Sequence, residues 1–151
     1  MKAILTTAAA VIALSGATAF AESHAAMGDA EAGEGDFRKC KSCHAISSAE
    51  EDIVKGGRTG PNLYGVVGRT AGTYEDFNYG DDIVAAGEAG LVWDTTNLVE
   101  YLEDPKAFLA AYLEDDGARS KMTFKLKDGQ DVAAYLATFS EEGEMEEGEG
   151  S

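Results

Sequence analysis

Basic residues are scarce in this chain. It has 12 Lys and Arg residues against 28 Asp and Glu residues, which gives a formal net charge of −16 at pH 7. A protein that binds nucleic acid needs a basic surface to neutralise the phosphates. The composition therefore argues against nucleic acid as a partner.

Cysteine and histidine are also rare: the chain has only Cys40, Cys43, His24 and His44. A structural zinc site needs four ligands, normally as two separate pairs, and here His44 directly follows Cys43. Period-2 alternation of apolar residues is scarce, so the βαβ setting of a thioredoxin-like dithiol is missing. A disulfide across two residues would be small and strained. None of these three alternatives accounts well for the two cysteines.

No strongly apolar run is long enough to span a bilayer. Residues 3–20 are the nearest candidate, but Thr, Ser and Gly interrupt them, and a spanning helix needs about 20 apolar residues. The same segment has a positive start at Lys2, an apolar stretch over residues 8–14 and small residues at Ala19 and Ala21. This pattern is typical of a signal peptide cleaved after Ala21, and an uncleaved anchor is the weaker alternative. We predict a protein exported to the periplasm.

The most informative motif is Cys40-Lys41-Ser42-Cys43-His44. A Cys-x-x-Cys-His run is typical of the attachment site of a c-type haem. The two thiols each form a thioether with a haem vinyl group, and the imidazole of His44 is then placed as the proximal ligand of the iron. We therefore expect one covalent haem c as the cofactor, bound through Cys40 and Cys43.

A haem iron with one histidine needs a sixth ligand or stays open to small molecules. Of the four methionines, Met1 is in the signal peptide, Met27 precedes the first predicted helix and Met145 is in the acidic tail. Met122 is left as the candidate, although a methionine can also simply fill space. Met/His ligation saturates the iron and suits it to electron transfer.

The chain divides into three predicted parts. Residues 1–21 are the signal peptide, residues 22–139 form one haem domain of ordinary size, and residues 140–151 are a Glu- and Gly-rich tail. The tail has too little apolar surface to order itself, so we predict a disordered extension, with a docking tail as the alternative.

Helix signals dominate the haem domain, which predicts an all-α fold. We expect four helices, joined by glycine-rich loops and started by Asp29, Asp94, Pro105 and Asp128. The apolar periodicity is clearest in the last helix, at Val132, Tyr135, Leu136 and Phe139. Gly33 in the first helix suggests a close helix crossing, because a glycine inside a helix otherwise only weakens it. The haem is expected to form much of the core.

With these motifs in view, the chain resembles a class I cytochrome c, and is most similar to the longer bacterial c2 and c550 types. The resemblance covers residues 33–139 and rests on the haem motif together with residues 59–65, Gly68-Arg69, Trp93, Tyr101-Leu102, Pro105, residues 121–124 and Tyr135-Leu136. It implies short helices and loops wrapped around one covalently bound haem.

The resemblance also implies individual roles. The carbonyl of Pro61 would accept a hydrogen bond from the far nitrogen of His44 and orient its ring. Tyr79 and Trp93 would bind a haem propionate with Arg69 nearby, and Tyr101 would lie near the sulfur of Met122; ordinary core packing is the alternative for Trp93 and Tyr101. The chain departs from compact members by a longer segment from Pro105 to Met122 and by Ile83, which stands where they have a polar residue.

The implied function is that of a diffusible periplasmic one-electron carrier, acting as a monomer and not as an enzyme. It would accept electrons from a quinol–cytochrome c oxidoreductase. It would deliver them to a terminal oxidase in respiration, to a reaction centre in photosynthesis, or to a reductase. The alternative is an open-site haem protein, such as a peroxidase or a gas-binding cytochrome.

The few cations are grouped near the predicted haem ligands. Three flank the thiols (Arg38, Lys39 and Lys41), four flank Met122 (Arg119, Lys121, Lys125 and Lys127), and two precede the Pro61 loop (Lys55 and Arg58). We expect a basic edge around the haem that faces an acidic patch on a partner. Scattered solvated side chains are the alternative.

Overall fold

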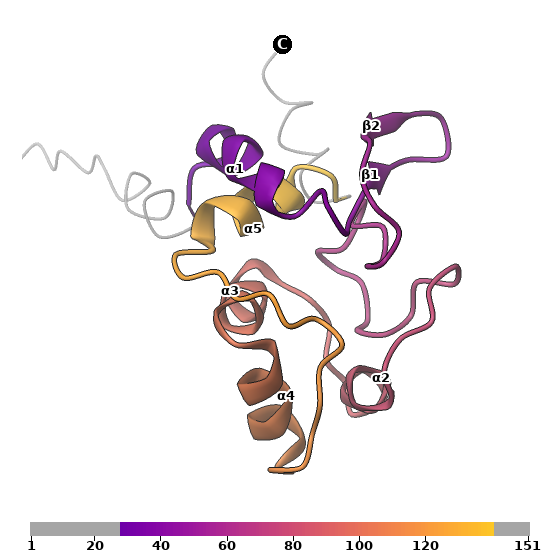
Figure 1. The fold of residues 1–151 in the computed structure, drawn as a ribbon, viewed down its shortest axis with the longest axis vertical. Helices are drawn as coiled ribbons and strands as arrows, with labels where there is room; N and C mark the ends of the chain where they lie inside the picture. The colour runs from indigo at the N-terminus through magenta and orange to yellow at the C-terminus, as the bar shows by residue number, and fades with distance from the viewer. Residues whose placement is uncertain (1–27, 141–151) are drawn as a thin grey trace, which may run out of the picture.

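The computed structural model describes residues 28–140, so the predicted signal peptide and the acidic tail beyond Ser140 lie outside the described residues. Most of the regular secondary structure consists of short helices, which are joined by long loops (Figure 1). The elements are α1 (Ala30–Asp36), the 3₁₀ helix η1 (Phe37–Lys39), β1 (Ile46–Ser47), β2 (Asp52–Val54), α2 (Asp81–Glu88), α3 (Thr95–Glu103), α4 (Pro105–Leu113) and α5 (Gln130–Ala137). The helical class is confirmed. Between residues 28 and 140, no helix combines the length and apolar character that a bilayer span requires.

The first and last helices cross closely, as Gly33 predicted (Figure 1). Gly33 is buried, and a Cβ at this position would collide with the backbone carbonyl of Asp131 and lie 2.8 Å from the Cβ of Tyr135. The ring of Phe37 packs 5.7 Å from that of Tyr135, and the Asp29 amide donates to the Asp131 carboxylate at 2.8 Å. This crossing fixes α1, which leads into the haem motif, against α5.

Three of the four predicted helix starts are present. The Asp29 carboxylate accepts hydrogen bonds from the amides of the first turn of α1, and Asp94 forms a capping box with Asn97 at the start of α3. Asp104 caps α4 with Pro105 in its first turn. These local signals therefore set the element boundaries.

The fourth predicted start is wrong by one residue. Asp128 has a φ of 59°, in the left-handed region, and α5 begins after Gly129, which makes no side-chain cap. Gly129 is buried against the side chain of Leu102, so packing rather than capping sets this start. The helix also ends at Ala137, which leaves Phe139 in the turn that follows.

Three elements were not predicted from the sequence: the strands β1 and β2 and the helix α2. The antiparallel pair β1–β2 has only two and three residues, too few to show a period-2 pattern. Helix α2 begins at Asp81 after Gly80, with no side-chain cap, and carries Asp81 and Asp82 in its first turn. Two acids in a first turn do favour the positive end of a helix, which is the signal that could have found it.

Candidate functional site

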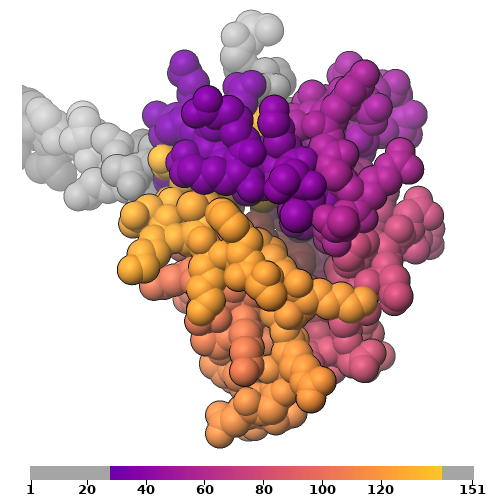
Figure 2. Space-filling view, viewed as in Figure 1, coloured from indigo at the N-terminus to yellow at the C-terminus, as the bar shows by residue number. Residues whose placement is uncertain are grey.

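A cavity of about 330 Å³ lies at the centre of the fold. In Figure 2, the molecule is hollowed between the indigo segment around the haem motif and the orange segment around Met122. All nine residues singled out in the sequence line this cavity: Cys40, Cys43, His44, Pro61, Arg69, Tyr79, Trp93, Tyr101 and Met122. They come from segments up to 82 positions apart in the sequence, from Cys40 to Met122, so the fold is what brings them together.

His44 is held by a hydrogen bond to the backbone. Its Nδ1 lies 2.7 Å from the carbonyl oxygen of Pro61, and because a carbonyl can only accept, Nδ1–H is the donor. Burial lowers the pKa of His44, and the bond to Pro61 opposes that shift only in part. The ring is therefore neutral at pH 7, with Nε2 left as an electron-pair donor.

Gly60 makes room for this ring. A Cβ at Gly60 would lie 2.6 Å from Nδ1 and 2.7 Å from Nε2 of His44, closer than packed atoms can come. The backbone of Gly60 is also tied to the haem motif, because its amide donates to the Cys43 carbonyl at 2.9 Å. Glycine is therefore required for the loop to pass directly over the imidazole.

The two thiols stand in different environments. The amides of Cys43 and His44 both donate to the carbonyl of Cys40 at 3.0 Å, which closes one tight turn. Burial raises the pKa of Cys40 to about 11, whereas hydrogen bonds from Thr59 and Ser42 lower the pKa of the exposed Cys43. The turn presents both sulfurs and the imidazole to one cavity.

Met122 reaches the cavity from the connection between α4 and α5. Its amide donates to Oγ of Ser120 at 3.2 Å, and the same oxygen lies 3.2 Å from the hydroxyl of Tyr101. Tyr101 was expected near the methionine sulfur, and the contact that the structure records runs through Ser120. Burial raises the pKa of Tyr101, so its hydroxyl keeps its proton. Ser120 was missed because nothing in its local sequence sets it apart.

Arg69 brings a half-buried positive charge to the cavity wall. Its guanidinium donates to the backbone carbonyls of Asn62, at 3.0 Å, and of Tyr64, and it lies 5.2 Å from the centre of the Tyr74 ring. Burial lowers its pKa, and the neighbouring hydroxyl of Tyr79 works against that shift. Because an arginine keeps its charge even when partly buried, this wall favours an anionic group.

Trp93 and Tyr101 form the buried aromatic side of the cavity. Both side chains are less than one-tenth exposed, and their ring centres are 5.0 Å apart. Phe108 from α4 packs against both rings, at 6.0 Å from Trp93 and 5.7 Å from Tyr101. Packing and a cofactor contact are therefore compatible here, because both side chains belong to the buried core and also line the cavity.

The cavity has the chemistry to hold a haem. Thiols for two thioether bonds, a neutral imidazole, a thioether sulfur and a half-buried guanidinium all face it, and the rest of its wall is mostly apolar. In the part of the chain from Gly28 to Ser140, no group of three or more His, Cys, Asp or Glu side chains could hold a metal ion.

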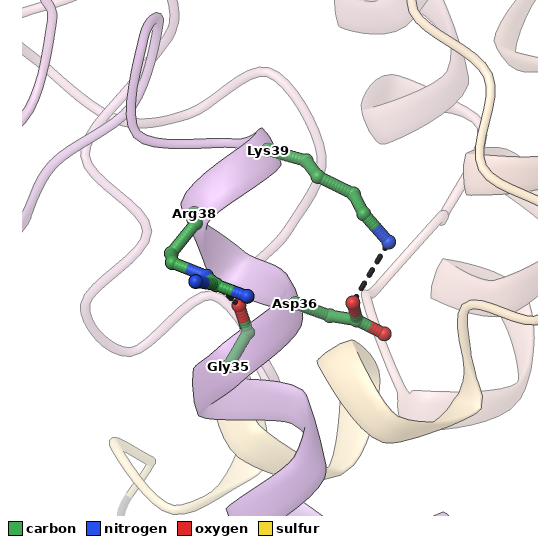
Figure 3. A network of polar contacts seen from close by, with 4 residues as sticks. All are labelled: Gly35, Asp36, Arg38 and Lys39. Carbon is green, nitrogen blue, oxygen red and sulfur yellow. Dashed lines mark hydrogen bonds and ion pairs between the residues drawn. The ribbon is translucent and has the colours of Figure 1, made fainter.

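Several cations near the cavity contact neighbouring groups of the protein, which their sequence positions did not suggest. Lys39 is paired with Asp36 at 2.7 Å, and Arg38 donates to the Gly35 carbonyl (Figure 3). Lys125 is paired with Asp104 at 2.6 Å. Lys121 donates to the backbone carbonyl of Asn78 at 2.8 Å, which leaves its charge uncompensated by that contact. The basic edge is therefore weaker than the predicted one.

The chain is similar to known cytochromes over nearly its whole length. It is 64% identical over 138 residues to the cytochrome c-551 of Roseobacter denitrificans, covering 89% of this chain and 95% of that protein. It is 51% identical over 140 residues to the cytochrome c2 of Rhodobacter capsulatus, covering 91% and 98%. No family model matches the chain.

Solved structures agree with the sequence comparison. The crystal structure of the Rhodobacter capsulatus cytochrome c2 matches with a TM-score of 0.72 and 56% identity, over 74% of this chain and 97% of that one. The ferric cytochrome c-550 of Paracoccus versutus matches with a TM-score of 0.72 and 50% identity, over 75% and 98%.

Proposed function

The chain belongs to the class I bacterial cytochromes c of the c2, c-550 and c-551 type, and from this premise we propose a soluble periplasmic one-electron carrier with His44 and Met122 as axial ligands. As in its relatives, the cofactor is one covalent haem c, and the role is electron transport rather than catalysis. When bound, the haem supplies an iron that gains and loses one electron.

One observation carries the ligand assignment. His44 and Met122 line a single cavity, and the hydrogen bond from His44 Nδ1 to Pro61 leaves Nε2 as the donor atom. The bond to Pro61 fixes the orientation of the ring and makes it a stronger donor. A thioether ligand favours the reduced state and closes the sixth position to small molecules. This arrangement supports a carrier over an open-site haem protein.

The remaining wall residues are proposed to hold the haem carboxylates. Arg69 supplies a positive charge, and Tyr79 and Trp93 supply one hydrogen-bond donor each. A half-buried Arg69 is fixed by its two carbonyl contacts, so it would offset the charge of a propionate without moving. Tyr101, through Ser120, would restrain the backbone of Met122.

The proposed partners are membrane electron-transfer complexes. A quinol–cytochrome c oxidoreductase would be the donor, and a terminal oxidase, a reaction centre or a reductase would be the acceptor. Export through the segment 1–21 would place the protein with the periplasmic faces of these complexes. Lys121 and Arg119, exposed at the mouth of the cavity, would steer it to acidic surfaces.

The proposal is tested with the haem-loaded protein and isolated membranes. Ferric protein mixed with quinol and a quinol–cytochrome c oxidoreductase should be reduced rapidly, and adding a terminal oxidase should reoxidise it. The control replaces the protein with its Met122→Ala variant, whose open iron should also react with hydrogen peroxide. A wild-type protein that exchanges no electrons with these complexes but turns over peroxide would overturn the proposal.

A further inference from the structure

The segment that carries Met122 is held on each side by a carboxylate from another part of the fold. We propose that Asp82 and Asp104 are positioning residues that keep Met122 at the cavity and slow its replacement by other ligands. The inference rests on the proposed function, because it takes Met122 as an axial ligand. We call residues 119–126 the methionine segment. In the sequence it belongs to the connection from α4 to α5, and in space it passes between α4 and α2 (Figure 1).

The methionine segment has little else to hold it. It contains no helix or strand, and five of its eight residues are exposed, while Ser120, Met122 and Leu126 are partly buried. A segment of this kind gains little from apolar burial and loses conformational entropy when it is ordered. Its position therefore depends on polar contacts with the helices beside it.

Asp104 holds the end that follows Met122. One oxygen of its carboxylate accepts from the Ala107 amide at 3.1 Å, and the other lies 2.6 Å from Nζ of Lys125. The next residue, Leu126, donates its amide to the Leu102 carbonyl at 2.7 Å. The hydrogen bond from Lys125 is the main reason that the pKa of Asp104 lies below its usual value. The carboxylate is therefore charged at neutral pH and joins α3, α4 and the methionine segment.

Asp82 holds the end that precedes Met122. It lies in the first turn of α2, and its carboxylate accepts the backbone amide of Arg119 at 2.8 Å, across 37 positions of sequence. Lys121 adds a contact on the same side, because its Nζ donates to the carbonyl of Asn78. A backbone amide of an irregular segment needs such a partner, and α2 supplies it.

The consequence concerns ligand exchange. For an external ligand to bind the iron, Met122 has to leave, and the methionine segment has to move with it. Two fixed ends restrict that movement, so each carboxylate makes the departure of Met122 less favourable. An exposed ion pair, such as that of Asp104, and a single hydrogen bond, such as that of Asp82, each stabilise a structure only modestly. We therefore predict a change of about two- to fivefold in ligand affinity when either carboxylate is removed.

The experiment measures imidazole binding to the ferric, haem-loaded protein at neutral pH, by equilibrium titration and by stopped flow. Asp104→Asn keeps a side chain that can cap α4 but removes the charge facing Lys125. This variant and Lys125→Gln should each bind imidazole about two- to fivefold more tightly. Asp82→Ala should do the same, whereas Asp81→Ala, in the same turn of α2, should behave as the wild type. The double variant Asp82→Ala/Asp104→Asn should bind about tenfold more tightly if the two ends act independently.

A second control separates positioning from general stability. Asp29→Ala removes the cap of α1 and should lower the melting temperature without changing imidazole binding. Equal imidazole affinity in the wild type, Asp82→Ala and Asp104→Asn would overturn the inference, as would an equal increase in Asp29→Ala. A wild-type ferric protein without the sulfur-to-iron absorption band would instead overturn Met122 as a ligand, and with it the proposed function.

Discussion

The imidazole of His44 is fixed by the carbonyl of Pro61, which accepts its Nδ1–H at 2.7 Å, while Gly60 leaves just enough space beside the ring. One short loop thus sets both the tautomer and the orientation of the proposed proximal ligand. This loop is as much a part of the site as the haem motif that contains His44.

Gly60→Ala should therefore damage the site directly. A Cβ 2.6 Å from Nδ1 has to displace either the ring or the loop, and both changes weaken the bond to Pro61. We expect a low yield of haem-loaded protein and, in what forms, a higher reduction potential measured by redox titration, because an imidazole that donates less strongly stabilises the ferric state less. Gly35→Ala is the control, because nothing lies within 4 Å of a Cβ at Gly35. Wild-type yield and potential in Gly60→Ala would contradict this account of the loop.

Met122→Ala should leave the haem attached, because the thioether bonds belong to Cys40 and Cys43. Loss of the thioether should abolish the weak sulfur-to-iron band of the oxidised protein, lower the reduction potential and open the iron to external ligands. The visible spectrum and a redox titration measure all three. If the band persists in Met122→Ala, Met122 is not the distal ligand.

Lys121→Glu should slow electron transfer to a partner at low salt. Lys121 lies at the mouth of the cavity, and reversing its charge weakens the attraction to an acidic surface with little effect on the reduction potential. Lys106→Glu, an exposed change on α4 and outside the cavity lining, should matter less. Stopped-flow rates over a range of salt concentrations provide the measurement. Rates that do not change with salt would count against steering by this edge.

Gly33→Ala should destabilise the crossing of α1 and α5. The added Cβ meets the backbone of Asp131 and cannot be relieved by a side-chain rotation, so we expect a loss of about 1–3 kcal/mol in the free energy of unfolding. Gly35→Ala, two residues along the same helix, should instead gain roughly 0.5–1 kcal/mol. Urea unfolding of both variants tests this contrast, and equal stabilities would show that the crossing tolerates a methyl group.

The parts of the site that the sequence predicted are those encoded in short motifs. Cys40, Cys43 and His44 are contiguous, and Gly60 and Pro61 belong to a turn whose residues signal a tight loop. The nine candidate residues share one cavity, which the resemblance to class I cytochromes c made predictable. Composition and periodicity alone would have predicted only a small helical domain with a haem motif.

The parts that were missed depend on contacts between distant segments. Ser120 belongs to the site because its hydroxyl contacts that of Tyr101, nineteen positions earlier in the chain. The paired residues Asp104 and Lys125 are likewise 21 positions apart. No local sequence pattern predicts such pairs. The basic edge was therefore predicted to be stronger than it is, because the pairing of Lys125 with Asp104 was not foreseen. The pairing of Lys39 with Asp36, three positions apart on one helical turn, could have been foreseen.

The assignment of His44 and Met122 as axial ligands is tested most directly by the absorption spectrum of the haem-loaded protein in both oxidation states. If His44 and Met122 are the axial ligands, the reduced protein should be low-spin and the oxidised protein should show the weak sulfur-to-iron band. Adding carbon monoxide should leave the reduced spectrum unchanged. A high-spin spectrum that changes on adding carbon monoxide would show that Met122 does not bind the iron and would indicate an open-site haem protein.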